Sequence, residues 1–125
     1  MKVALIQTSL IWENPGANRA HFSNLIHTLE GETDLIVLPE MFTTGFTMNP
    51  EHIPYEEAAH TLEWMRENAI RTGAALAGSF IFQEGVVYFN RLVFMFPDGN
   101  YEYYDKRHTF TLAGEDKVYQ RGNQR

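Results

Sequence analysis

The sequence predicts an α/β layered fold, because short apolar runs alternate with longer segments of helical periodicity. Residues 35–38 form a continuous apolar run, of the kind found in strands that are buried on both faces. A helical stripe precedes this run, and its members, spaced i, i+3, i+4 and i+7, are Phe22, Leu25, Ile26 and Leu29. Another apolar run, at residues 3–6, begins the chain. The pattern of strand, helix and strand indicates parallel strands joined by a right-handed crossover.

Start and stop signals mark the ends of these first elements. Asn14 followed by Pro15 is typical of an N-cap residue and a proline at the first helical position. Gly31 is a natural C-terminal stop for this helix. Pro39 cannot donate to a sheet ladder, so the strand at 35–38 should end there. We also expect the first strand, at residues 3–6, to be buried.

The second half of the chain passes from a helix into antiparallel strands. Its predicted elements are a loop at 43–55, a helix at about 56–72, a strand at 74–82, a strand at 86–96 and a hairpin partner at 101–106. Gly73 ends the helix, and the Pro-Asp-Gly-Asn sequence at 97–100 is a strong turn signal. From His108 to the end the chain is loop-like, and no further helix or strand is expected.

Two helices can cover only one face of a sheet of five or six strands. The aromatic strands at 74–82 and 86–96 therefore need a covering element on the other face, because an exposed apolar sheet face favours association. A partner subunit or a continuation of the chain would supply it. We expect residues 1–125 to form a single domain, since no linker or repeat divides them.

Composition excludes several classes of function. The 125 residues carry a formal charge of −6, which argues against nucleic-acid binding because phosphate contacts need a cationic surface. No run approaches the length of a membrane span, and the apolar run at 3–6 is too short for a secretory signal. We expect a soluble, cytoplasmic protein. The chain has no cysteine, so it offers no disulfide, thiolate metal ligand or thiol nucleophile.

Metal and nucleotide sites are not predicted. The five histidines show no ligand-like clustering such as an HExxH helix. Neither a Walker motif nor a GxGxxG motif occurs, so nucleotide binding has no support.

Glu40 is the first candidate for chemistry. It follows Pro39 directly, just beyond the carboxyl end of a predicted buried strand, where ligand sites collect in open α/β sheets. Met41 and Phe42 flank the carboxylate, so we expect it to be partly desolvated, which suits a general base. The alternative is a glutamate that caps the next turn or lies in solvent.

Lys106 and Glu115 are the other charged candidates. The strand period of two places Glu102, Tyr104 and Lys106 on one face. If that face is interior, Lys106 needs a carboxylate partner, and Glu40 could serve. A lysine held in a pocket can stabilise a developing oxyanion. The alternatives are an exposed edge-strand lysine and, for Glu115, a solvated loop charge.

Four segments in this order resemble the nitrilase superfamily of carbon–nitrogen hydrolases. They are KVALIQTSL, DLIVLPEMFTTGF, VYFNRLVFMFPDGNYEYYDKRH and LAGEDKVYQRG. The stretch LPEMFTTGF is similar to the omega-amidase branch, which hydrolyses the terminal amide of small α-keto acid amides. The resemblance implies an αββα sandwich, with two sheets face to face and helices outside, present here as an incomplete N-terminal half. It also implies that subunits pair.

The resemblance further implies a Glu-Lys-Cys mechanism without metal or organic cofactor. By similarity Glu40 is the general base, Lys106 steadies the tetrahedral oxyanion, and Glu115 is a supporting second glutamate. The family cysteine lies after the lysine, attacks the amide carbon and leaves a thioester for water to cleave. The expected substrate pocket includes Phe42, Phe46 and His108.

The missing cysteine is the departure from this pattern. Thr109 and Thr111 are poor substitutes, because they lie beside the lysine motif and not in a later turn. We expect the N-terminal half of an amidase, inactive alone, whose complete enzyme converts an omega-amide such as 2-oxoglutaramate to the acid and ammonia. A small amide substrate and a homo-oligomer or complementing second half are the expected partners. A non-catalytic binding or assembly module and a flavodoxin-like ligand-binding domain are the alternatives.

Overall fold

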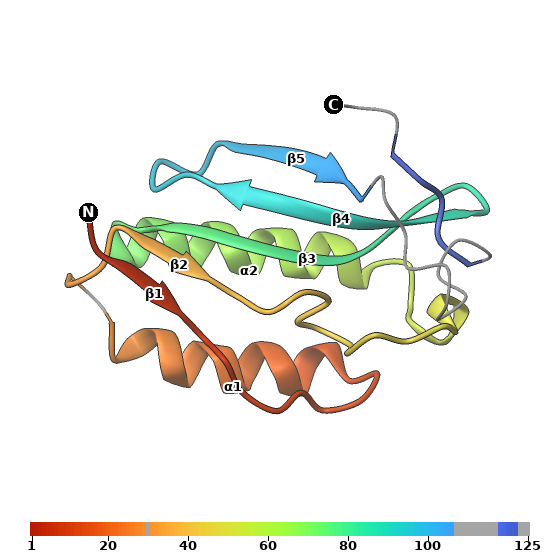
Figure 1. The fold of residues 1–125 in the computed structure, drawn as a ribbon, viewed down its shortest axis with the longest axis horizontal. Coiled ribbons are helices and arrows are strands. Elements are labelled where there is room, and N and C mark those ends of the chain that lie inside the picture. Colours follow the sequence, from red (N-terminus) through yellow and green to blue (C-terminus); the bar gives the residue numbers. More distant parts are fainter. Residues whose placement is uncertain (30, 107–117, 123–125) are drawn as a thin grey trace.

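A single five-stranded sheet organises the part of the chain that the computed structural model describes, residues 1–29, 31–106 and 118–122. The strand order follows the chain, and the strands are β1 (Val3–Leu5), β2 (Leu35–Val37), β3 (Ala75–Glu84), β4 (Val87–Met95) and β5 (Tyr101–Asp105). The first three strands are parallel, whereas β4 and β5 are antiparallel additions. This arrangement confirms the predicted α/β fold, with a hairpin following two strand–helix–strand units (Figure 1).

Two helices connect the parallel strands. The first, α1 (Pro15–His27), begins as predicted: the Asn14 side chain accepts a hydrogen bond from the backbone N–H of Ala17. It ends at His27, about one turn before the predicted stop at Gly31. The second, α2 (Glu57–Thr72), ends at Gly73, whose φ of 71° only glycine adopts without strain.

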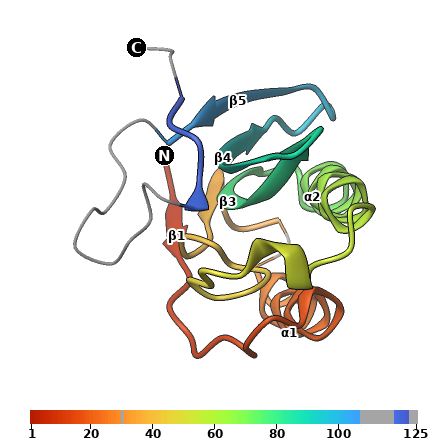
Figure 2. The same cartoon turned by 90° about the vertical axis from the view of Figure 1, so that its right-hand side faces the viewer.

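Both helices lie on the same face of the sheet (Figure 2). The strand order advances in one direction, so two crossovers of the same hand place their helices side by side. Between helices and sheet lies the main core, which contains Phe22, Ile26, Ile36, Leu38, Phe42, Met65, Ala69, Leu76, Phe80, Val93 and Met95. The rings of Phe22 and Phe42 meet edge to face, with centroids 5.6 Å apart, an arrangement that aromatic pairs prefer.

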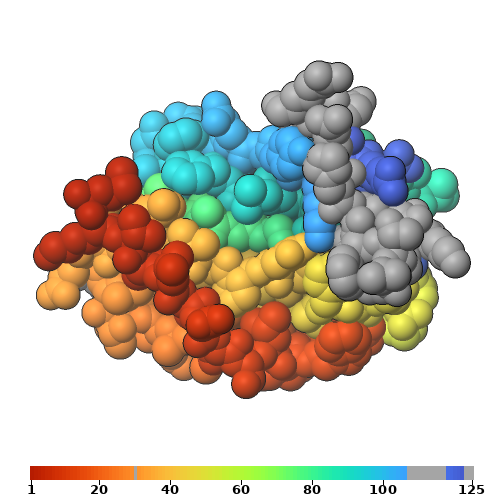
Figure 3. All heavy atoms as spheres, in the orientation of Figure 1, coloured from red at the N-terminus to blue at the C-terminus, as the bar shows by residue number. Residues whose placement is uncertain are grey.

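The other face of the sheet is not covered by either helix, and its strands are visible at the surface in Figure 3. We call this the open face. On β1, Leu5 is 76% exposed among the described residues, and on β4 Leu92 is 43% exposed. The predictions of burial therefore need correction. The strand at 3–6 is an exposed edge strand, and in β2 only Ile36 is fully buried, because helices cover one face alone.

The end of the sheet near the β3–β4 turn holds a second, smaller core. It consists of Met41, Ile53, Ile81 and Tyr119, and a short 3-10 helix, η1 (Pro50–His52), lies in the loop nearby. Tyr119 belongs to the described segment 118–122, and its hydroxyl donates to the carbonyl of Thr47 at 2.7 Å. This contact brings the late segment back against the loop that follows β2.

Candidate active site

Backbone hydrogen bonds to β3 hold the segment around Glu40. Before it, the N–H of Leu38 donates to the carbonyl of Ala77 at 2.8 Å. After it, the N–H of Met41 donates to the Ser79 hydroxyl at 2.9 Å, and that of Phe42 donates to the Ser79 carbonyl at 3.1 Å. The glutamate is therefore tied on both sides to a central strand, immediately after β2 ends.

A strained residue follows Glu40. Met41 has a φ of 54°, in the left-handed region that non-glycine residues seldom adopt, at a cost on the order of 1–3 kcal/mol. The Met41 side chain is buried in the smaller core, and that of Phe42 is buried in the main core. The turn therefore directs consecutive side chains to different places. Those of Met41 and Phe42 pack in the protein interior, and that of Glu40 lies at the open face.

Lys106 follows β5 and is held from two sides. Its backbone N–H donates to the carbonyl of Asn90 on β4 at 2.8 Å, and its own carbonyl accepts the N–H of Gly122 at 3.0 Å. Gly122 packs so closely that a Cβ there would overlap the carbonyl oxygen of Asp105. The position therefore requires glycine, and segment 118–122 fixes the backbone that carries the lysine.

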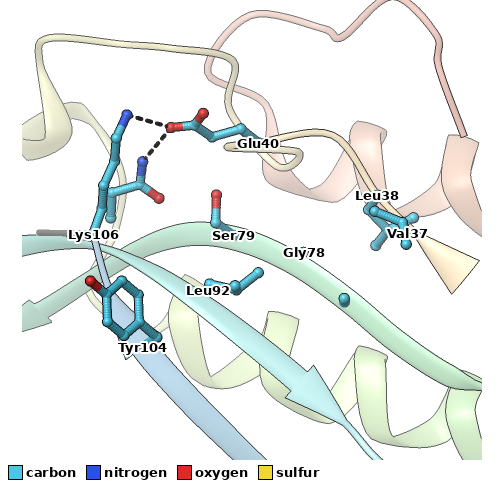
Figure 4. Close-up of a pocket in the computed structure, with 10 residues that line it drawn as sticks. Val37, Leu38, Glu40, Gly78, Ser79, Leu92, Tyr104 and Lys106 are labelled. Atoms are coloured by element: carbon cyan, nitrogen blue, oxygen red, sulfur yellow. Dashed lines mark hydrogen bonds and ion pairs between the residues drawn. The ribbon is translucent and has the colours of Figure 1, made fainter. Parts of the chain in front are cut away.

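The side chains of Glu40 and Lys106 point toward one another from the loop after β2 and the end of β5 (Figure 4). Lys106 Nζ lies 2.9 Å from Glu40 Oε1, and Asn90 Nδ2 donates to the same oxygen at 2.9 Å. The ammonium also lies 5.2 Å from the centre of the Phe46 ring, within cation–π range. Among the described residues, 29% of the Lys106 side chain and 48% of the Glu40 side chain are exposed.

These groups border a cavity of about 350 Å³ on the open face. Its lining residues are Val37, Leu38, Glu40, Ala77, Gly78, Ser79, Asn90, Leu92, Tyr104 and Lys106. A mostly apolar cavity with a few converging polar groups is the usual form of a small-molecule site. The carboxylate can accept a proton, and the ammonium beside it can stabilise negative charge on a substrate oxygen.

The structure brings some of the predicted site residues together and places others apart. Glu40 and Lys106 form the expected contact, and Phe46 lies beside the lysine. Phe42 is fully buried in the main core and is not among the residues that line the cavity. Neither Met41 nor Phe42 encloses the Glu40 carboxylate, which is nearly half exposed. His108 and Glu115 lie outside the described residues.

Sequence reasoning missed two residues that shape the site. Asn90, 2% exposed, donates to Glu40, and the hydroxyl of Ser79 accepts the Met41 N–H. One signal was present for Asn90, because an amide side chain in the middle of an aromatic strand needs a buried polar partner. For Ser79 the sequence holds no such signal, since its partner is a backbone group from a loop 38 residues earlier.

The residues next to Asn90 and Lys106 form a different pair on the opposite face of the same strands. Arg91 donates to both carboxylate oxygens of Asp105, at 2.7 and 3.0 Å, and to Glu84 at 2.9 Å. Its guanidinium lies between the rings of Phe82 and Tyr103, at 3.9 and 4.0 Å. Burial acts to lower the pKa of Arg91, but the hydrogen bonds to its acidic partners outweigh burial and raise this pKa above its ordinary value.

Two other features are absent from the described part of the structure. Within residues 1–29, 31–106 and 118–122, no group of three His, Asp or Glu side chains could hold a metal ion. In the same part of the chain, no helix has the length and apolar character needed to cross a membrane.

Curated omega-amidases match this chain along its whole length. The omega-amidase YafV of Yersinia enterocolitica is 40% identical over 127 residues, and that of Escherichia coli K12 is 38% identical over 131. Both alignments cover all of this chain and 48% of the relative. The 2-oxoglutaramate amidase of Bacillus subtilis is 24% identical over 90% of the chain. The chain thus spans about half the length of the curated relatives it matches.

Solved structures agree in fold. XC1258 from Xanthomonas campestris, a CN-hydrolase superfamily protein with an arsenic adduct in its active site, is 38% identical, with a TM-score of 0.92. The match covers 99% of this chain and 47% of that one. One helix layer and one sheet are present here, which are two of the four layers of the αββα sandwich. The family model for carbon–nitrogen hydrolases matches residues 2–124, and this chain therefore belongs to the carbon–nitrogen hydrolase family.

Proposed function

We propose that this chain supplies the acid–base half of an amidase site that hydrolyses the terminal amide of a small α-keto acid amide, such as 2-oxoglutaramate. The observation that carries the proposal is the 2.9 Å contact between Glu40 and Lys106 at the rim of the open-face cavity. The names of the relatives, omega-amidase and 2-oxoglutaramate amidase, support the substrate class. A cavity of about 350 Å³ suits a small linear amide.

In the proposed mechanism Glu40 moves the protons. It takes the proton of a cysteine thiol from a segment outside these 125 residues, and the sulfur attacks the amide carbon. The carbonyl oxygen becomes an oxyanion beside the Lys106 ammonium, which stabilises the new charge. The C–N bond then breaks as Glu40 returns the proton to the nitrogen, and ammonia leaves.

The second half of the cycle uses the same two groups. Glu40 takes a proton from water, and the resulting hydroxide attacks the thioester carbon next to Lys106. The C–S bond breaks, the thiol regains its proton from Glu40, and the acid is released. Glu115 is proposed as a supporting glutamate in both stages, and Phe46 and His108 are proposed to contact substrate.

The open face is the proposed place for the missing part of the site. Apolar side chains such as Leu5 and Leu92 are exposed there among the described residues, and the cavity opens on the same side. We propose that the remainder of the fold, supplied by the same polypeptide or by another subunit, packs on this face and carries the cysteine. Pairing of complete subunits is proposed from the family resemblance.

One sequence feature favours a second candidate, a non-catalytic binding module: the 125 residues contain no cysteine. The deciding experiment compares the complete translation product of the reading frame with the 125-residue chain. Ammonia release from 2-oxoglutaramate is measured, with glutaramate, which lacks the keto group, as the matched substrate. We expect turnover of 2-oxoglutaramate by the complete product alone. A folded complete product that binds the amide without releasing ammonia would support the binding module instead.

A further inference from the structure

Asn90 contacts both members of the Glu40–Lys106 pair. Its backbone carbonyl accepts the N–H of Lys106 at 2.8 Å, and its side-chain Nδ2 donates to Glu40 Oε1 at 2.9 Å. The residue lies in β4 and is 2% exposed, so its side chain has little freedom to turn. One strand residue therefore fixes the position of the lysine backbone and the direction of the glutamate carboxylate.

The two carboxylate oxygens of Glu40 are in different surroundings as a result. Oε1 accepts from two donors, the charged Lys106 Nζ and the neutral Asn90 Nδ2. Within the described residues, no hydrogen bond is directed at Oε2. An oxygen held by two donors has little capacity left for a further proton, whereas the other oxygen keeps both of its lone pairs.

We infer that Asn90 is a positioning residue that fixes the rotation of the Glu40 carboxylate, so that Oε1 binds the lysine and Oε2 exchanges protons with nucleophile and substrate. This inference rests on the proposed function, because it assigns Asn90 a part in that reaction. Lysine alone would leave the carboxylate free to rotate about the ion pair, since an ammonium is a point charge without directional preference. A second donor, held by a rigid strand, removes that freedom.

A neutral amide suits this task better than a charged group. A second cation would hold the carboxylate more tightly and oppose its protonation, and an acidic side chain would repel it. An amide N–H carries only a partial charge, and its hydrogen bond still fixes the direction of the carboxylate. Misplacement of a catalytic group by about 1 Å costs on the order of 10²-fold in rate, so the loss of one directing hydrogen bond has a measurable effect.

The kinetic test uses Asn90→Leu in the complete translation product, since leucine keeps the volume and removes the donor. Asn68→Leu is the matched control, because Asn68 is also buried, at 5% exposure, but bonds to Trp64 and Arg71 on α2. With 2-oxoglutaramate we expect kcat to fall about 10²-fold in Asn90→Leu while KM stays within about threefold. A kcat within about threefold of the Asn68→Leu value would overturn the inference.

A second measurement does not depend on activity or on the folding of an Asn90 variant. In ¹⁵N-labelled protein, the side-chain amide signals of Asn90 should shift when Glu40→Gln is introduced, and those of Asn68 should not. Unchanged Asn90 signals would overturn the inference. If the unaltered protein releases no ammonia from any tested amide, the proposed function fails, and a shift of the Asn90 signals would then establish the contact without a catalytic role.

Discussion

Two polar pairs lie on opposite faces of the same two strands. The first is Glu40–Lys106, which lies on the open face together with Asn90. The second is Arg91–Asp105, formed by the sequence neighbours of Asn90 and Lys106, and it lies on the other face. The Arg91 and Asp105 side chains are 8% and 14% exposed, compared with 29% for Lys106. The register that pairs Arg91 with Asp105 also brings the backbone N–H of Lys106 to the carbonyl of Asn90.

The pairs differ in how many of their carboxylate oxygens are hydrogen-bonded to the partner side chain. Arg91 binds both oxygens of Asp105 and is stacked between two rings, so although this pair also borders a cavity, of about 320 Å³, both carboxylate oxygens are already bonded within the protein. The Glu40–Lys106 contact uses a single carboxylate oxygen and borders a cavity. A fully bonded, desolvated pair serves stability, whereas a partly bonded pair at a cavity is available for chemistry. We therefore expect substitutions in the two pairs to affect different properties.

The largest expected effect is on activity. Glu40→Gln in the complete translation product keeps the shape of the side chain but removes its capacity to take a proton. We expect the rate of ammonia release from 2-oxoglutaramate to fall by about 10²–10⁴-fold, with the thermal stability little changed. Glu102→Gln, an exposed carboxylate change on β5 that lies away from the cavity, is the control and should retain activity. Equal rates for the two variants would remove Glu40 from the mechanism.

The next effect is on stability. Arg91→Met leaves the Asp105 carboxylate buried without its bidentate partner, and we expect a loss of about 3–5 kcal/mol in the free energy of unfolding, measured by urea denaturation. Combining it with Asp105→Leu removes both charges and should restore most of the loss, since an apolar pair can replace a buried ion pair. A loss below about 1 kcal/mol in the single variant would show that this pair contributes no more to stability than an exposed ion pair does.

A smaller effect is expected at Gly78, which lies beneath the segment that carries Glu40. A Cβ at this position would lie 2.9 Å from Phe42 Cδ1 and 3.1 Å from Leu38 Cβ, both in the main core. Gly78→Ala should therefore lower the free energy of unfolding by about 1–3 kcal/mol through overpacking. Gly16→Ala in α1, where nothing lies within 4 Å, is the control. The test fails if both alanine variants are equally stable.

The smallest effect concerns pH and the loop after Glu40. Glu13 accepts from the Thr47 hydroxyl at 2.6 Å and from His52 Nδ1 at 3.0 Å. The Thr47 bond and then the His52 bond lower the pKa of Glu13, and the hydrogen bond and charge of Glu13 raise the pKa of His52. The Glu13 contribution to stability is present above its ordinary pKa of 4.5 and is lost as pH falls through the lowered value.

The His52 contribution has the opposite sign. It is fully present below the ordinary pKa of 6.5 and is lost as pH rises through the raised value. We expect His52→Asn to lower the Tm slightly more at about pH 5.5 than at about pH 8.5, because the contribution of the charged histidine declines as pH rises through its raised pKa. The effect is small because 55% of the His52 side chain is exposed. In a Glu13→Gln background this pH dependence of the His52→Asn effect should disappear; its persistence would assign it to another group.

Local signals predicted most of the elements. The Asn14 cap, the glycine after α2, and the turn at 97–100 act through neighbouring residues alone, so they can be recognised without the fold. Burial was less predictable. The apolar run at 3–6 suggested a buried strand and the run at 35–38 a strand covered on both faces, but α1 and α2 lie on one side of the sheet, and within the described residues the runs have an open face.

The sequence by itself determined the α/β class and the positions of most elements along the chain, and it marked Glu40 and Lys106 as candidates, because periodicity and strand ends are written in adjacent residues. Only the tertiary structure decided that Asn90 directs the carboxylate, that Met41 adopts a left-handed conformation, and that Phe42 packs in the core. Each of these features depends on contacts between residues that are distant in the sequence. Such contacts are not encoded in neighbouring residues.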